Sequence, residues 1–338
     1  AVAVLTDTEA PIALDQLSGE IHASAKTALL EDSRFPREAA MDRLRVALGG
    51  VGADDSARIE DRISESFALW GQGFGSWSQW GSDGNAAAMD RTIGGLLMGG
   101  DALVWDNARF GVLGGYSRSD FSVDDRASSG TADTYTLGVY GGGEWDAFTM
   151  TGGAAHSWHS VDTSRSVAFT GFSDSLSASY SARTVQAWGE AAYSFETGAA
   201  RFEPFANLAY VNLSTDGFTE SGGAAALTAA PNTVDATFAT LGLRAETDVV
   251  LGNMQTTLRG TVGWRHAFGG APTSQMTFAS GSDDFTIAGV PLAQDMLVLD
   301  AGINANLTEN ATLGFAYGGQ FGSGVQEHSA RASLNVRF

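Results

Sequence analysis

The stretch SARTVQAWGEAAYSF, residues 181–195, alternates apolar and polar side chains and decides the fold class. One set of alternate positions holds Val185, Ala187, Ala191, Tyr193 and Phe195, and the other holds Thr184, Gln186, Trp188 and Glu190. Because successive side chains of a β-strand point to opposite faces, this pattern predicts a strand with one apolar and one polar face.

The same period of two recurs from Ser66 to the end of the chain and predicts twelve strands. They begin near residues 66, 91, 107, 132, 146, 181, 200, 236, 253, 294, 310 and 325. Each interval can hold the roughly 9–11 residues of a tilted strand that crosses a membrane. The sequence therefore indicates an all-β chain over residues 66–338.

The connections between these strands alternate in length. Short ones fall at 105–107, around 146, and at 197–199, 251–253 and 308–310; long polar segments cover 118–131, 160–180, 214–235 and 269–290. Only the last connection, 322–324, is short where a long one is expected. Bacterial membrane barrels have short periplasmic turns and long outer loops. We therefore predict a twelve-stranded antiparallel transmembrane barrel with both ends in the periplasm.

A soluble antiparallel sheet would also have one apolar face, so the two folds differ in what their polar face surrounds. In a barrel it lines the lumen, and the residues expected there are Glu190, Glu203, Arg244, Glu246, Arg259 and Arg265. Aromatic residues near strand ends would form the two interfacial girdles. These are Trp70, Trp77, Trp105, Tyr116, Tyr140, Trp145, Trp158, Tyr193, Tyr210, Trp264 and Tyr317.

Composition excludes several classes of function. A net charge of −20 argues against nucleic acid as a partner, because phosphate binding needs excess Lys and Arg. The chain has no cysteine, which removes disulfides and thiolate metal sites. We expect no cofactor and no metal site. No apolar run is long enough for a transmembrane helix, and the sequence from Ala1 onward lacks the basic and apolar regions of a signal peptide, so a mature fragment or excised domain is expected.

Residues 1–65 carry the helix signal and form a separate unit from the barrel of 66–338. Apolar residues recur at helical spacing from Ile12 to Ala28. A second helix, PREAAMDRLRVAL, is expected from Pro36 to Leu48 and would end at Gly49-Gly50. A polar linker is expected from Gly49 to Ser64.

Four stretches, in order, resemble autotransporter translocator domains of type V secretion. They are LDQLSGEIHASAKTALLEDSRFPREAAMDRLR (14–45), GGLLMGGDALVWDNARFGVLGGYSRSD (94–120), AWGEAAYSFETGAARFEPFANLAYVNL (187–213) and GTVGWRHAFG (260–269). The resemblance implies export of a covalently attached N-terminal passenger to the cell surface. It also implies outer-membrane lipid, periplasmic chaperones and the barrel assembly machinery as partners of a monomer. A final strand with Leu334, Val336 and Phe338 on its lipid face resembles the signal that this machinery reads.

With the passenger outside and the first strand starting in the periplasm, the segment before Ser66 must cross the lumen. A helix suits this task because its backbone hydrogen bonds are internal. The pore helix would present Arg37, Glu38, Asp42, Arg43 and Arg45. We expect Arg37, Arg43 and Arg45 to pair with lumen carboxylates; the alternative is a solvated helix face. Pro36 would kink or break the helix, which leaves its point of insertion open.

Some members of this family cleave their passenger at an Asn-Asn pair in the pore helix. This sequence has no asparagine before Asn85, so we expect no such cleavage.

Two other functions compete with export: an outer-membrane enzyme and a simple porin. His156, Ser157, His159 and Asp162 could suggest acid–base or nucleophilic chemistry. Alternation places His156 and His159 on opposite faces, which weakens a joint site, and we expect no catalytic residue. A porin would have no use for a helical N-terminal segment.

Overall fold

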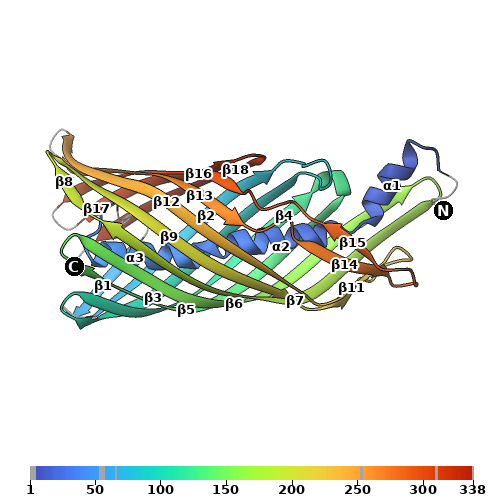
Figure 1. The fold of residues 1–338 in the computed structure, drawn as a ribbon, viewed down its shortest axis with the longest axis horizontal. Coiled ribbons are helices and arrows are strands. Elements are labelled where there is room, and N and C mark those ends of the chain that lie inside the picture. The colour runs from blue at the N-terminus through green and yellow to red at the C-terminus, as the bar shows by residue number, and fades with distance from the viewer. Residues whose placement is uncertain (1–4, 53–57, 65–66, 252–253, 309–310, 337–338) are drawn as a thin grey trace.

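Twelve long antiparallel strands close into a barrel with a helix along its axis (Figure 1). The computed structural model describes residues 5–52, 58–64, 67–251, 254–308 and 311–336. The barrel strands are β2 Phe67–Trp80, β3 Met89–Trp105, β4 Ala108–Val123, β5 Ser128–Trp145, β6 Phe148–Phe169, β7 Phe172–Tyr193, β9 Ala200–Thr215, β12 Asn232–Leu251, β13 Met254–Phe268, β16 Asp295–Thr308, β17 Ala311–Gly322 and β18 Val325–Val336. The predicted twelve-stranded barrel is confirmed.

The barrel closes where β2 meets β18. Their pairing runs from Val325 opposite Trp80 to Ser329 opposite Ser76. The rest of this edge of β2 pairs with an additional strand, β1, Arg58–Ser64. Unpaired backbone groups are costly in hydrocarbon, and β1 provides partners for the stretch from Phe67 to Gln72. The polar linker expected over 49–64 is therefore wrong for its second half.

Tight turns lie at one end of the barrel, as predicted for 105–107, 146 and 197–199; the turns expected at 251–253 and 308–310 fall partly outside the described residues. Asp146 and Gly198 adopt positive φ angles of 54° and 63° in two of them. Such angles favour glycine and are tolerated by aspartate. A short strand, β8 Phe195–Thr197, extends one turn by pairing with β9. This end, at the left of Figure 1, is the periplasmic end.

The segments expected as long outer loops are mostly strands, which corrects the prediction. Over 118–131, β4 and β5 continue to a single 3-10 turn, η2 Asp124–Arg126. Over 160–180, β6 and β7 pair without interruption up to a turn at Thr170-Gly171. Their outward faces are rich in serine, which is polar but compatible with a strand, so polarity alone misled the prediction.

The two remaining outer segments form a small sheet of their own. It consists of β10 Phe218–Thr219, β11 Leu227–Ala229, β14 Thr273–Phe278 and β15 Phe285–Ala288, in the order β10-β11-β14-β15. The first two strands lie in the connection between β9 and β12, and the other two follow β13. The predicted loops at 214–235 and 269–290 thus cover the outer mouth of the barrel as an antiparallel sheet.

The outward face of the barrel is apolar between two aromatic belts. Nine of the eleven aromatic residues expected in the girdles are exposed. Trp70 and Tyr140 are buried instead, and Trp70 Nε1 donates to Tyr140 Oη at 2.6 Å inside the lumen. On β5 the exposed Tyr135 and Trp145 mark the two belts. Ten residues at about 3.3 Å each, tilted by about 40°, separate them by roughly 25 Å, the height of an outer-membrane apolar band.

Three helices precede the strands. They are α1 Glu9–Leu17, α2 Ile21–Asp32 and α3 Arg34–Ala47; α2 and α3 run along the lumen, and α1 lies outside the mouth (Figure 1). Gly19, with φ +68°, ends the continuous helix expected up to Ala28. None of the helices in the described part of the chain is long and apolar enough to cross a membrane.

Pro36 does not begin a helix of its own. It lies in the first turn of α3, which begins at Arg34, two residues earlier than predicted. The first turn tolerates proline because its N–H groups have no partner within the helix. Only Ser33 separates α2 from α3, so the two form one rod of about 40 Å at about 1.5 Å per residue.

Candidate functional site

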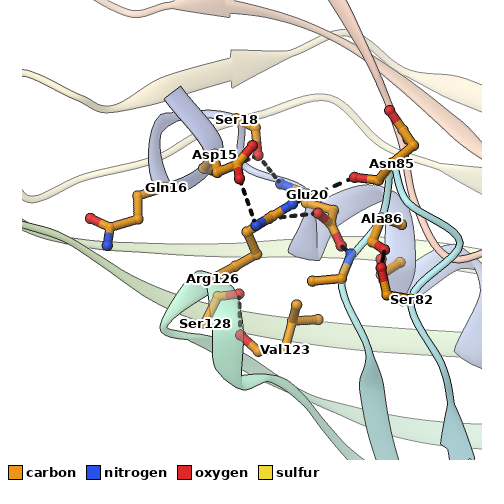
Figure 2. Close-up of polar contacts among 12 residues, drawn as sticks. Asp15, Gln16, Ser18, Glu20, Ser82, Asn85, Ala86, Val123, Arg126 and Ser128 are labelled. Atoms are coloured by element: carbon orange, nitrogen blue, oxygen red, sulfur yellow. Dashed lines mark hydrogen bonds and ion pairs between the residues drawn. The ribbon is translucent and has the colours of Figure 1, made fainter. Parts of the chain in front are cut away.

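Arg126 anchors the chain at the outer mouth, where α1 gives way to α2 (Figure 2). Its guanidinium donates to Asp15 Oδ2 at 3.0 Å and to Glu20 Oε2 at 2.9 Å. The other oxygen of Glu20 accepts from the Ala87 amide at 2.9 Å. Burial raises the pKa of Glu20, although the hydrogen bond from Arg126 opposes that shift. Arg126 therefore joins the tip of β4–β5 to the start of the lumen helix.

A second anchor at the mouth centres on Glu220, between β10 and β11. Arg165 of β6 donates to both of its oxygens at 2.7 and 2.6 Å, and His22 Nε2 lies 2.8 Å from Oε1. The Leu227 amide donates to Oε2 at 2.8 Å. Burial alone would raise the pKa of Glu220, but the hydrogen bonds from Arg165 and His22 lower it to about 2. The cluster ties α2 to the outer sheet.

The turn after β15 is pressed against α2. Thr27 Oγ1 donates to the Val290 carbonyl at 2.5 Å, and the Val290 amide donates to Ser24 Oγ at 3.1 Å. Lys26 Nζ donates to the Thr273 carbonyl at 2.7 Å. A Cβ on Gly289 would lie 2.3 Å from the Ser24 nitrogen. Every residue of α2 is buried by these contacts and by the barrel wall.

Charged pairs from opposite walls hold the middle of the rod. Glu31 accepts from Arg265 of β13 at 2.6 Å, and Asp32 pairs with Arg91 of β3. Arg34 pairs with Glu327 of β18. Glu327 also accepts from Ser76 Oγ at 2.7 Å, so this layer bridges the closing seam between β2 and β18.

The junction between α2 and α3 is held by Gln186 of β7. Its side-chain amide donates to the Ser33 carbonyl at 2.7 Å, and its oxygen accepts from Arg37 Nη1 at 2.9 Å. A helix end leaves carbonyls without partners, and Gln186 satisfies one of them. The partner of Arg37 is therefore the side-chain amide of Gln186 and not the carboxylate that the sequence predicts.

Arg43 of α3 makes a two-pronged contact with the barrel wall. Its Nε donates to Asp101 Oδ2 at 2.6 Å and its Nη2 to Oδ1 at 3.1 Å. Asp101 also accepts from Arg109 Nε at 2.6 Å and from Tyr140 Oη at 3.1 Å. Arg43 thus has the carboxylate partner expected of it, but on a residue that the sequence did not single out.

The periplasmic end of the rod rests on β7, β9 and β12. Arg45 pairs with Asp42 of its own helix at 2.7 Å and lies 3.9 Å from Glu190. Arg244 pairs with Glu190 at 2.8 Å and with Glu203 at 2.7 Å.

The chain that follows α3 continues along the same wall. The amide of Val51 donates to Glu203 at 3.1 Å, and that of Gly52 donates to Glu246 at 2.8 Å. The carboxylates predicted on the inner face of the barrel therefore receive the chain where it leaves α3.

The rod does not fill the lumen. A cavity of about 190 Å³ lies beside α3 and is bounded on the helix by Glu38, Met41 and Asp42. Thr240, Asn207 and Gln320 are among the residues of the opposite wall. Arg259, also predicted to face the lumen, is buried on β13. The lining mixes these polar groups with aromatic side chains, among them Phe74, Phe205 and Phe238.

The C-terminal assembly signal cannot be followed in full. Leu334 and Val336 belong to β18, whose side chains from residue 331 are not described, and Phe338 lies outside the described residues.

The histidine cluster considered for catalysis does not form a site. His159 is buried inside, between Thr134 and Thr184 at 2.8 Å each, while His156 packs on Trp158 outside. Ser157 pairs with Thr136 Oγ1 at 2.8 Å rather than with a histidine.

Several charged residues that pair inside the barrel or at its mouth are not among those predicted from the sequence. They are Glu31, Asp32, Arg34, Arg91, Asp101, Arg165, Glu220 and Glu327. Arg91 and Asp101 occupy inward positions of β3, and Glu327 occupies one of β18. The alternation that predicted Glu190 could have found these three. No local pattern marks Glu220, because the sequence of 214–235 predicts a polar loop and not a strand.

Comparison with known proteins settles the family. Residues 69–318 match a family described as "Autotransporter beta-domain". The chain belongs to the autotransporter β-domain family. Among known structures, the translocator domain of the autotransporter NalP from Neisseria meningitidis has a TM-score of 0.68 at 18% identity, over 93% of this chain and 98% of that one. The transport unit of AIDA-I from Escherichia coli has a TM-score of 0.52 at 17% identity, over 82% and 92%.

Curated relatives of this autotransporter β-domain are longer than the chain. An extracellular serine protease of Serratia marcescens is 37% identical over 325 residues, which cover 96% of this chain and 30% of that protein. The autotransporter β-domain therefore spans under a third of the length of such relatives. As a member of this family, the barrel lies in the bacterial outer membrane.

Proposed function

We propose that this autotransporter β-domain exports a passenger attached to its N-terminal side and then remains as a pore plugged by its own helix. One observation carries the proposal: α2 and α3 run inside the barrel from the outer mouth towards the end where β2 begins (Figure 1). A chain held in this way has its upstream end outside the cell and its downstream end in the wall.

The chain divides by role into residues 1–65, which form the linker and pore-spanning segment, and residues 66–338, which form the barrel. The contacts of Arg37 with Gln186, of Arg43 with Asp101 and of Arg45 with Glu190 hold the rotation and height of the helix in the barrel. Buried charge pairs lose hydration, so their contribution is to register and sealing more than to net stability.

The passenger of this chain is proposed to be of the serine protease class, since relatives that match over nearly the whole chain bear that name. Any such activity would belong to the passenger, and the barrel itself is not proposed to be an enzyme. We further propose that periplasmic chaperones and the barrel assembly machinery bring the chain to the membrane. In this scheme Leu334, Val336 and Phe338 provide the assembly signal, and the product is a monomer.

Export is tested with a tagged reporter domain fused ahead of Ala1 behind a secretion signal. We expect the tag to be degraded by protease added to intact cells, while the barrel resists. The control carries the same reporter on a barrel that lacks residues 325–338. A reporter that stays inside cells although the intact barrel folds would refute export.

The plug is tested by conductance in planar bilayers. The intact chain should conduct little, and deletion of residues 1–50 should open a large pore, because α2 and α3 leave the lumen. Deletion of residues 1–18 is the matched control: it removes α1 and should leave the pore closed. Equal large conductance of all three proteins would favour a simple porin. Fold is checked by the shift of unheated barrels on denaturing gels.

A further inference from the structure

The lipid-facing side of the barrel carries a hollow that takes no part in the contacts between the helix and the lumen wall. It is a groove of about 890 Å³ across the outward faces of β2 to β7. Small residues at outward positions, Gly100, Gly114 and Ala154, lower its floor between the larger Met98 and Leu137. The groove is almost wholly apolar, and it lies at the level of the membrane.

Polar groups stand at the outer end of this groove. His156 lines the groove and lies two residues closer to the membrane centre than the exposed Trp158 of the outer belt. Its ring packs on that of Trp158 at a centroid distance of 4.3 Å. Within the described part of the chain, His156 Nε2 is buried and has no hydrogen-bond partner. A histidine on a lipid-facing strand is costly unless a polar group of a ligand reaches it.

A cation lies just beyond the groove. Arg183 of β7 is exposed on the lipid-facing side and pairs in register with Trp158. It lies two residues closer to the outer mouth than Val185, which lines the groove. No carboxylate among the described residues forms an ion pair with Arg183. By contrast, Arg118 of β4, at the same belt, pairs with Asp133 at 3.0 Å. Arg183 is therefore available to an anion at the membrane surface.

We propose that this groove binds one phosphorylated glycolipid of the outer leaflet, lipid A. Its acyl chains would lie over Gly114 and Ala154, and a phosphate would contact Arg183. His156 would provide a hydrogen bond to an ester or hydroxyl group just below the interface once its ring turns to uncover Nε2. The outer leaflet is indicated because Arg183 and Trp158 lie at the end of the barrel that carries the outer sheet. An arginine contact to phosphate is a strong, charge-assisted one.

The test uses the full chain in nonionic detergent, with lipid A titrated and the bound fraction measured by native mass spectrometry. Arg183→Gln should weaken binding about tenfold or more, the loss expected for a hydrogen bond to a charged group. Arg118→Gln is the matched control and should change binding by less than about twofold.

A second pair of variants tests the groove without changing charge. Ala154→Leu fills the floor and should displace lipid A, whereas Ala206→Leu, exposed on the outward face of β9 away from the groove, should not. Equal effects of Arg183→Gln and Arg118→Gln would overturn the proposal. Binding of zwitterionic phosphatidylethanolamine as tight as that of lipid A, and equally sensitive to Ala154→Leu, would also overturn it.

Discussion

Arg43 of α3 and Asp101 of β3 form a two-pronged ion pair inside the barrel, with N–O distances of 2.6 and 3.1 Å. Their side chains are 1% and 0% exposed. Arg109 and Tyr140 complete the shell around the same carboxylate. This relationship ties α3 to β3 at one height and one rotation, because both oxygens of Asp101 accept from the same guanidinium.

Asp101→Asn should destabilise the barrel more than Arg43→Gln. The first variant leaves Arg43 and Arg109 facing each other without an anion, whereas the second leaves Asp101 paired with Arg109. Breaking a buried pair costs about 3–5 kcal/mol, and we expect Asp101→Asn at the upper end of that range. Urea unfolding of both variants in detergent measures the difference. The opposite order would show that Arg43, not Asp101, is the centre of the cluster.

Acid should loosen the outer mouth through Glu220. Its pKa is lowered to about 2, so its contribution to stability is complete above the ordinary carboxyl pKa of 4.5 and falls as pH drops towards 2. The protection factors of the amides of residues 21–32, which correct for the intrinsic pH dependence of exchange, should therefore fall over this range. Glu220→Gln should already exchange faster at pH 7 and lose most of this pH dependence. An unchanged pH profile in Glu220→Gln would assign the effect to other carboxylates.

Gly289→Ala should lift the turn after β15 away from α2. The added Cβ would lie 2.3 Å from the Ser24 nitrogen and 2.4 Å from the Ala23 carbonyl carbon, which are backbone atoms that cannot give way. We expect a loss of about 1–3 kcal/mol, as for other overpacked sites. Limited proteolysis within 269–294 reports the opening. Gly270→Ala, with nothing within 4 Å of its Cβ, is the control and should behave as wild type.

The membrane band predicts where an outward charge is tolerated. Leu243→Arg places a cation on the apolar face of β12 and should cost about 2–4 kcal/mol if it lies near the bilayer centre. Ser164→Arg lies on the same outward side of the barrel but beyond Trp158, so it should cost little. Folding yields in lipid vesicles compare the two. Similar losses for both would place the band higher on the barrel than the aromatic belts indicate.

Local alternation was enough for most of the barrel. Val185 and Gln186 are neighbours in sequence, yet one faces lipid and the other the lumen, and the pattern announces both positions. Strand neighbours follow from short connections, so the topology needed little more. The errors lay in segments such as 160–180, where serine-rich strands rise above the membrane. Outside the bilayer the outward face of a strand contacts water and need not be apolar, so the alternation typical of a membrane strand is missing.

The sequence by itself therefore determined the twelve strands, their inward and outward faces and the presence of an N-terminal helix, because each depends on periodicity over a few residues. Only the tertiary structure decided the partners of that helix. Gln186 for Arg37, Asp101 for Arg43 and Glu220 for His22 depend on how far the helix is inserted and how it is turned. That choice is set by all walls of the lumen at once, and no local stretch of sequence contains it.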